Sequence, residues 1–148
     1  FVEGAAAAST DLIVGVFNGC FYNASTTEKP TWSNYYPAST VPANSEDITA
    51  FVNDNPFQEY QIATSAAISA TAHTVQALIG QVADTSASGE STSGRSNTTL
   101  NEGAAATTGK QWRILRRAED PDNSDFNAAY ANMIVVSNNK YQAFVVGV

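Results

Sequence analysis

Short apolar runs separated by polar turns make up the pattern of this chain. The first run, DLIVGVFNGCFY at 11–22, combines β-branched and aromatic residues with Gly15 and Gly19. Such residues favour strands, and a glycine inside a strand marks a bulge or a close approach of another backbone. We therefore expect a strand here, with an irregularity at each glycine.

Two further strands are predicted at 47–53 and 57–64, which are joined by an Asp-Asn-Pro turn. The second of them has a mixed alternation of residues, and its core face is expected to carry Tyr60 and Ile62. Alternation of this kind is typical of a strand with one buried face.

The C-terminal third has the clearest strand pattern. The segment QWRILRRAE at 111–119 alternates, with Trp112 and Ile114 on one face. After a loop, two apolar runs flank the turn SNNK at 137–140. Asparagine tolerates the positive φ that tight hairpin turns require, so this part predicts a β-hairpin.

The middle of the chain is less regular. Residues 65–83 have some helical spacing, but β-branched residues and Gly80 interrupt it. β-branched residues and glycine are poor helix formers, which favours a strand at 74–82 after a short turn or helix. The stretch 84–110 is of low complexity and predicts loop, with an edge strand at 96–100.

These elements predict a mainly β chain, as a compact antiparallel β-barrel or β-sandwich with long loops. The four consecutive alanines near the start are too short a segment for a stable isolated helix. Residues 1–10 are therefore interpreted as an extended N-terminal arm, and 11–148 as one β domain that contains the loop region 84–110.

Composition narrows the function classes. The chain has 148 residues, 14% of them charged, with seven Lys and Arg against fourteen Asp and Glu. A net charge of -7 opposes binding to a phosphate backbone, so no nucleic-acid partner is expected. No apolar run approaches the ~18 residues of a membrane-spanning helix, and no membrane association is expected either.

The chain has one histidine, His73, and one cysteine, Cys20. Disulfides and Cys/His zinc sites within one chain are thereby excluded, and any histidine-dependent catalysis would have to use His73. His73 has no neighbouring carboxylate in the sequence, and Cys20 lies within an apolar strand. We therefore interpret His73 as a histidine without catalytic partners and Cys20 as a buried, inert thiol. No enzymatic activity is expected.

Carboxylates offer two alternatives. Asp47, Asp54 and Glu59 lie near turns, and a glycosidase needs only two such groups. The segment DPDNSD at 120–125 has three carboxylates, which calcium prefers as ligands, but it lacks the glycine and the final glutamate of an EF-hand loop. Solvated turns are the favoured interpretation in both cases, and neither a metal nor a cofactor is expected.

Three aromatic residues, Trp32, Tyr35 and Tyr36, fall within TWSNYY at 31–36. A continuous strand would place Trp32 and Tyr36 on one face and Tyr35 on the other. Core packing is favoured for at least two of the three, and a contact surface for a partner is the alternative.

Five other residues are candidates for partner contacts. Arg113, Arg116 and Arg117 form the one basic cluster of the sequence, and alternation would place Arg113 and Arg117 on the same strand face. The cluster has two possible roles: it forms a local network of ion pairs, or it is a docking patch for an acidic partner. Phe1 and Val2 are apolar residues at the start of the predicted arm.

Four segments carry a further pattern: GVFNGCFY (15–22), KPTWSNYYP (29–37), ITAFVNDNPFQEYQIA (48–63) and RIL…ANMIVVSNNKYQ (113–142). They resemble a family of small tailed-phage virion proteins that decorate or cement the capsid, over most of the chain after residue 11. The matching positions are Gly15, Val16, Phe17, Gly19, Tyr22, Lys29, Pro30, Trp32, Ser33, Tyr35, Tyr36, Pro37, Asp54, Pro56 and Gln61.

The resemblance implies a non-enzymatic structural protein on the capsid exterior whose partner is the major capsid protein. The family has no catalytic motif, so no residue inherits an enzymatic role. Association of the chain with itself is left open. The alternative is a secreted carbohydrate-binding β-sandwich that uses exposed Trp32, Tyr35 and Tyr36 as a stacking platform, and a hydrolase with paired carboxylates is the third hypothesis.

Overall fold

The computed structural model describes residues 13–36, 43, 48–68, 72–86, 96–121, 123 and 125–138. The predicted N-terminal arm therefore lies outside the described residues. The elements are β1 (Val16–Asn23), β2 (Pro30–Ser33), β3 (Thr49–Asn53), β4 (Glu59–Ala63), α1 (Ala72–Leu78), β5 (Val82–Ala83), β6 (Thr85–Ser86), β7 (Thr99–Leu100), the 3-10 helix η2 (Glu102–Ala104), β8 (Trp112–Arg117) and β9 (Asn132–Ser137).

The strands form three antiparallel sheets, of orders β2-β1-β3, β4-β9-β8-β5 and β6-β7. The prediction of a mainly β, antiparallel chain is confirmed. A closed barrel, one of its two alternatives, is not found in the described part of the chain, where the strands form separate sheets.

The chain forms two compact units, the first with β1, β2 and β3 and the second with the later helices and strands. The strands predicted at 47–53 and 57–64 both exist, but β3 and β4 belong to different sheets and do not pair with each other. Whether residues 11–148 behave as a single domain stays a prediction.

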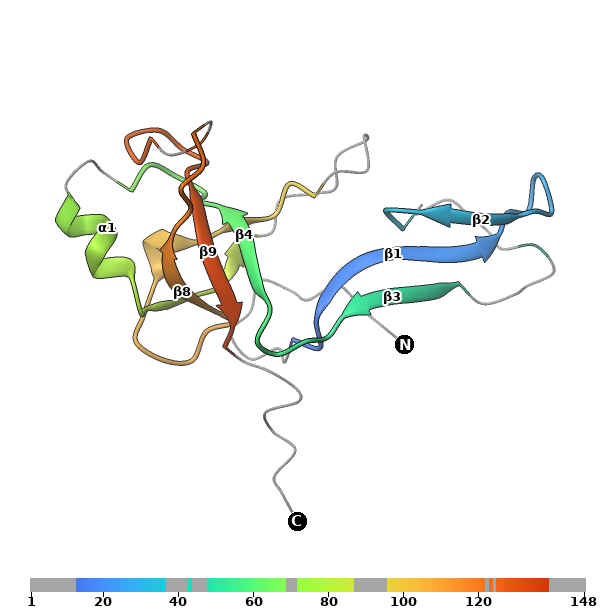
Figure 1. The fold of residues 1–148 in the computed structure, drawn as a ribbon, viewed down its shortest axis with the longest axis horizontal. Helices are drawn as coiled ribbons and strands as arrows, with labels where there is room; N and C mark the ends of the chain where they lie inside the picture. The colour runs from blue at the N-terminus through green and yellow to red at the C-terminus, as the bar shows by residue number, and fades with distance from the viewer. Residues whose placement is uncertain are drawn as a thin grey trace, which may run out of the picture. The chain divides into compact units, whose positions relative to one another are not determined.

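In the first unit, β1 lies between β2 and β3 (Figure 1). The register of β1 on β3 shifts between Phe17 and Gly19, which is the bulge predicted at that glycine. The predicted close approach at Gly15 is also present, since a Cβ there would come within 2.2 Å of the Asn53 backbone oxygen. Backbone geometry therefore requires both Gly15, which precedes β1, and Gly19, which lies within it.

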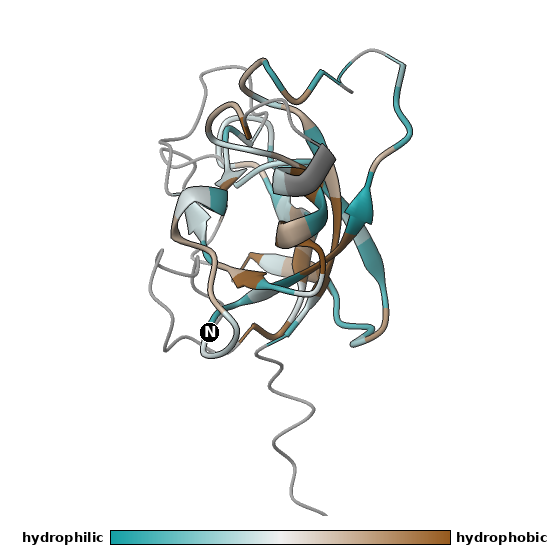
Figure 2. Cartoon of the chain, turned by 90° about the vertical axis from the view of Figure 1, so that its left-hand side faces the viewer, coloured by the Kyte–Doolittle hydropathy of each residue, from teal (hydrophilic) through white to brown (hydrophobic). Residues whose placement is uncertain are grey.

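The core of the second unit lies among the strands of the four-stranded sheet and β7 (Figure 2, in which apolar residues are brown). Its fully buried side chains include Val82, Leu100, Ile114, Met133 and Val135. The predicted strand at 57–64 is confirmed as β4, with Glu59 and Gln61 exposed and Tyr60 and Ile62 partly buried.

The predicted strand at 74–82 is wrong, because α1 covers most of this segment. Val75 and Leu78, three positions apart, are partly buried, whereas the residues between them are exposed, which is the spacing of a helix face. Gly80 follows the helix with φ +87°, a common way for a helix to end. The backbone of Ile114 then bonds Gly80 and Gln81, which attaches the end of α1 to β8.

The other sequence expectations are met in part. The edge strand predicted at 96–100 is present as the two-residue β7, and the first arm of the C-terminal hairpin is present as β9. The second arm of that hairpin and residues 87–95 of the low-complexity stretch lie outside the described residues.

Candidate functional site

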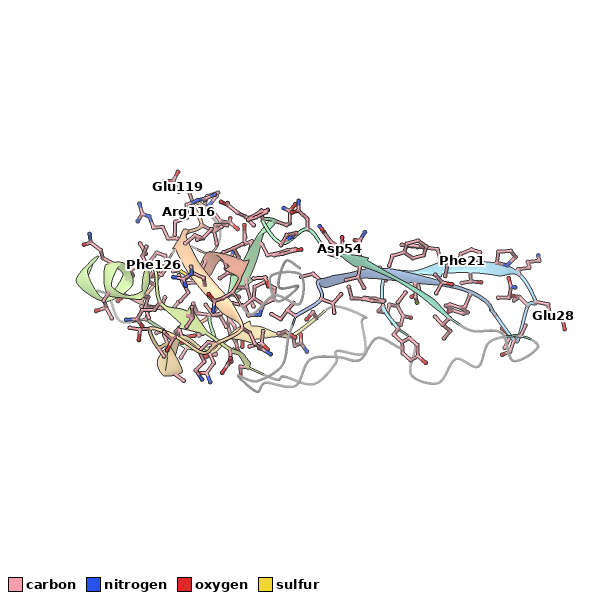
Figure 3. All side chains as sticks on the ribbon, turned by 90° about the horizontal axis from the view of Figure 1, so that it is seen from below. Phe21, Glu28, Asp54, Arg116, Glu119 and Phe126 are labelled. Atoms are coloured by element: carbon pink, nitrogen blue, oxygen red, sulfur yellow. The ribbon has the colours of Figure 1, made fainter. Side chains whose placement is uncertain are left out.

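One face of the first sheet gathers three exposed aromatic side chains, which we call the aromatic face: Phe21, Trp32 and Phe51. Phe21 lies opposite Trp32 in the pairing of β1 with β2, and Phe51 lies opposite Gly19 in the pairing of β1 with β3. Directly paired residues point to the same side of a sheet, so the three rings share one face although they come from three strands. Figure 3 labels Phe21 on β1.

Gly19 brings two of these rings together. The ring centroids of Trp32 and Phe51 are 5.0 Å apart, at an angle of 50°. Their strands lie on either side of β1, and the ring of Trp32 extends over Gly19 so closely that a Cβ on Gly19 would come within 2.6 Å of it. The absent side chain therefore lets the indole cross the central strand and contact the phenyl ring.

The aromatic face is open to solvent. Phe21, Trp32 and Phe51 are 42, 53 and 44% exposed, respectively. No residue of β1, β2 or β3 is charged. Exposed apolar area of this kind marks sites of protein or ligand contact, and Trp is among the residues that most often dominate binding energy.

The opposite face of the same sheet is covered in part by the chain that follows β2. Cys20 and Tyr22 on this face are buried. The Cys20 thiol donates to the Tyr35 carbonyl oxygen at 3.4 Å, and the Ser33 hydroxyl donates to the same oxygen at 2.6 Å. Burial raises the pKa of the Cys20 thiol.

We expect Cys20 to react slowly with Ellman's reagent in the folded protein at neutral pH. The thiolate is the reactive form, and a raised pKa together with complete burial leaves little accessible thiolate. The measurement is the labelling rate with and without urea, compared with free cysteine. Labelling of the folded protein at the rate of free cysteine would contradict the described burial.

The predicted strand over 31–36 ends early, because β2 stops at Ser33. The Ser33 hydroxyl turns the chain by bonding the backbone of Tyr35, so the expected alternation of Tyr35 and Tyr36 is wrong. Core packing for these aromatics is also wrong, since Trp32, Tyr35 and Tyr36 are all exposed. The structure thus groups Trp32 with Phe21 and Phe51 and not with the two tyrosines.

Sequence reasoning missed Phe21 and Phe51 as candidates. The sequence feature that could have identified them is an aromatic side chain within a predicted strand. The pairing of distant strands decides which side chains share a face, and a bulge reverses the alternation beyond it. The grouping could therefore not be read from alternation alone.

The arginine cluster is arranged differently from its prediction. Arg113 and Arg116 lie opposite Val136 and Ile134, which are two positions apart on β9. These two arginines therefore share a face, because a bulge in β8 lies between them, and the expected pairing of Arg113 with Arg117 is wrong. Arg117 is exposed at the end of β8.

Two of the arginines have local partners. The Arg116 Nη2 atom lies 2.7 Å from Glu59 Oε2, and both side chains are exposed. Arg113 donates to the Gly80 carbonyl oxygen and to Asn138 Oδ1. The side chain of Arg116 points away from the sheet (Figure 3). A single local ion pair at Arg116 is not a network, so the network of ion pairs and the docking role of the cluster both stay predictions.

The remaining candidates have no defined site. Phe1 and Val2 lie outside the described residues, and of His73 only the backbone, in α1, is described. The 120–125 segment is described in part: Asp120 Oδ2 accepts from Gln61 and Asn132. Among the described residues, no group of three or more His, Cys, Asp or Glu that could hold a metal ion is found.

Comparisons with known proteins add no assignment. No family model, no curated protein and no solved structure matches this chain. Within the described ranges, no helix has the length and apolar character needed to cross a membrane.

Proposed function

We propose that this chain is a non-enzymatic virion structural protein that attaches to the major capsid protein lattice of a phage through the aromatic face. The observation that supports the proposal is the exposure of Phe21, Trp32 and Phe51 on one sheet face that holds no charged residue. The sequence resemblance to capsid decoration proteins supplies the identity of the partner, and the capsid exterior is the location that it implies.

Exposed aromatic area is unfavourable in water and is stabilised by burial against a partner. Burying an aromatic side chain against a partner is worth roughly 1.5–3 kcal/mol, and clusters of aromatic anchors carry much of the energy of protein interfaces. The chain has a net charge of -7, and like charges at an interface repel each other. A contact face without charged residues avoids this repulsion where the chain meets the capsid lattice.

Replacing Trp32 with alanine is expected to weaken binding to purified capsid shells on the order of tenfold, as the loss of an aromatic anchor does. The measurement is co-sedimentation of the purified chain with shells over a range of concentrations. Trp32 is 53% exposed, so the variant should still fold, which circular dichroism can verify.

Phe57→Ala is the matched control. Phe57 is 81% exposed and lies in the turn before β4, in the second unit, whereas the aromatic face belongs to the first. Its removal should change binding by less than about twofold. Absence of co-sedimentation by the native chain would contradict the proposed partner, and equal losses for the two variants would contradict the aromatic face as the contact.

A carbohydrate-binding module is the second candidate, and the exposed indole of Trp32 favours it because sugar rings stack on aromatic faces. Alternation along β1 and β3 also places the polar residues Asn23, Thr49 and Asn53 on this face. Sugar hydroxyls need hydrogen-bond partners, which these side chains would have to supply, so it is the sequence resemblance that favours a protein partner. Binding of the isolated chain to a glycan array, with no binding to shells, would favour the module.

A further inference from the structure

A close ion pair in the second unit joins a buried carboxylate to a partly buried amine. Lys110 Nζ lies 2.6 Å from Asp84 Oδ2, and the two side chains are 24 and 8% exposed. The other carboxyl oxygen, Oδ1, accepts a hydrogen bond from the backbone N–H of Gln111 at 3.2 Å. One oxygen of Asp84 thus contacts the amine, while the other is held by a backbone donor.

The backbone holds both residues in place. Asp84 lies between β5 and β6, and its carbonyl oxygen accepts from the N–H of Asn101 at 2.9 Å. Lys110 lies just before β8, and its carbonyl oxygen accepts from Asn138 Nδ2 at 2.9 Å. Pairing of β5 with β8 brings the two segments together. Groups that the fold holds in contact react as if at very high concentration.

Buried residues shield the carboxylate of the pair from water. Val82, Ala83 and Gln111 next to the pair are fully buried. The amide of Gln111 is itself engaged, since its Oε1 accepts from the N–H and the hydroxyl of Thr85. A site with restricted access to water protects an amide once it has formed.

We propose that Lys110 and Asp84 form an intramolecular amide between their side chains. Moving one proton along the 2.6 Å contact converts the ion pair to a free amine and a carboxylic acid. Nζ then attacks Cγ, while the N–H of Gln111 stabilises the negative charge that develops on Oδ1.

The reaction balances within the pair. The ammonium group loses two protons, the Cγ–Oδ2 bond breaks, and Oδ2 leaves with both protons as one water molecule. The new bond joins Nζ to Cγ. No oxidant, cofactor or second substrate is consumed, and the inference is independent of the proposed capsid function.

The experiment is mass spectrometry of the purified full chain under denaturing conditions. The intact mass should be lower by one water molecule than the mass calculated from the sequence. Cleavage after glutamate should yield the fragments 60–90 and 103–119 joined to each other, because the first contains Asp84 and the second contains Lys110.

Lys110→Arg retains the positive charge without the amine and should give the linear mass and separate fragments. Lys29→Arg, at an exposed lysine of the first unit, is the matched control and should retain the linked fragments. The proposal is overturned if the native chain has the linear mass, or if the loss of water occurs without joined fragments. The result for the native chain decides the question even if the Lys110 variant does not fold.

Discussion

Replacing Glu102 with alanine is expected to lower the free energy of unfolding of the second unit by about 2–4 kcal/mol, the range for leaving several buried donors unsatisfied. The side chain is 7% exposed. Its two carboxylate oxygens accept from the backbone N–H groups of Ser65 and Ala66, each at 2.9 Å, and from the Ser65 hydroxyl. The variant leaves these donors of Ser65 and Ala66, which follow β4, without the carboxylate that accepts from them.

The measurement is urea unfolding followed by the fluorescence of Trp112, which lies in the second unit and is largely buried. A Trp32→Phe background removes the signal of the other tryptophan. Glu59→Ala is the matched control, because its ion pair with Arg116 is exposed and is worth only about 0–1 kcal/mol. Equal unfolding midpoints for the two variants would contradict the role assigned to Glu102.

Replacing Gly19 with alanine is expected to destabilise the first unit by about 2–4 kcal/mol, through backbone strain together with overpacking. Gly19 has φ +124°, a conformation that residues with a side chain rarely adopt. The new Cβ would also come within 2.6 Å of the Trp32 ring and 2.8 Å of the Ser33 carbonyl oxygen. The ring can move, but the backbone of the paired strand can move only by disturbing the sheet.

Labelling of Cys20 measures this effect within the first unit. If the thiol reacts only after the sheet opens, a loss of about 3 kcal/mol should speed labelling on the order of a hundredfold. Gly103→Ala is the matched control, because a Cβ there meets nothing within 4 Å, and its labelling rate should equal that of the native chain. An unchanged rate in Gly19→Ala would show that the bulge accommodates a side chain.

Three of the variants together separate an effect on stability from an effect on partner contact. Gly19→Ala displaces the indole of Trp32 and should weaken partner binding together with stability, whereas Trp32→Ala should weaken binding alone. Glu102→Ala acts in the other unit and reports on its stability. A loss of binding that followed stability in every variant would argue against a contact role for the aromatic face.

Local sequence was sufficient where one strand face is buried and the other is exposed. The alternation in β4, the bulge at Gly19 and the close approach at Gly15 all follow from residue types along a single strand. It was insufficient at 72–78, where β-branched residues favoured a strand. The structure forms a helix there, with Val75 and Leu78 on its partly buried side, because packing commonly overrides such weak local preferences.

The candidate site was found only in part from sequence. The sequence makes Trp32 a candidate for core or contact, whereas no local pattern distinguishes Phe21 and Phe51 from other strand aromatics. A bulge explains one error of grouping, since one extra residue in a strand reverses which side chains share a face. The bulge in β8 joins Arg113 with Arg116, whereas the grouping of Phe21 with Trp32 and Phe51 depends on the register of β1 with β2 and β3.

The sequence by itself determined that this chain is mainly β, acidic and without the histidine and cysteine pairs of common metal and disulfide sites. Those properties depend on composition and on alternation within single strands. Tertiary structure alone decided that three aromatic rings from three strands share one face, and that Lys110 contacts Asp84. Both depend on the register between segments distant in sequence, which side-chain preferences along one strand do not encode.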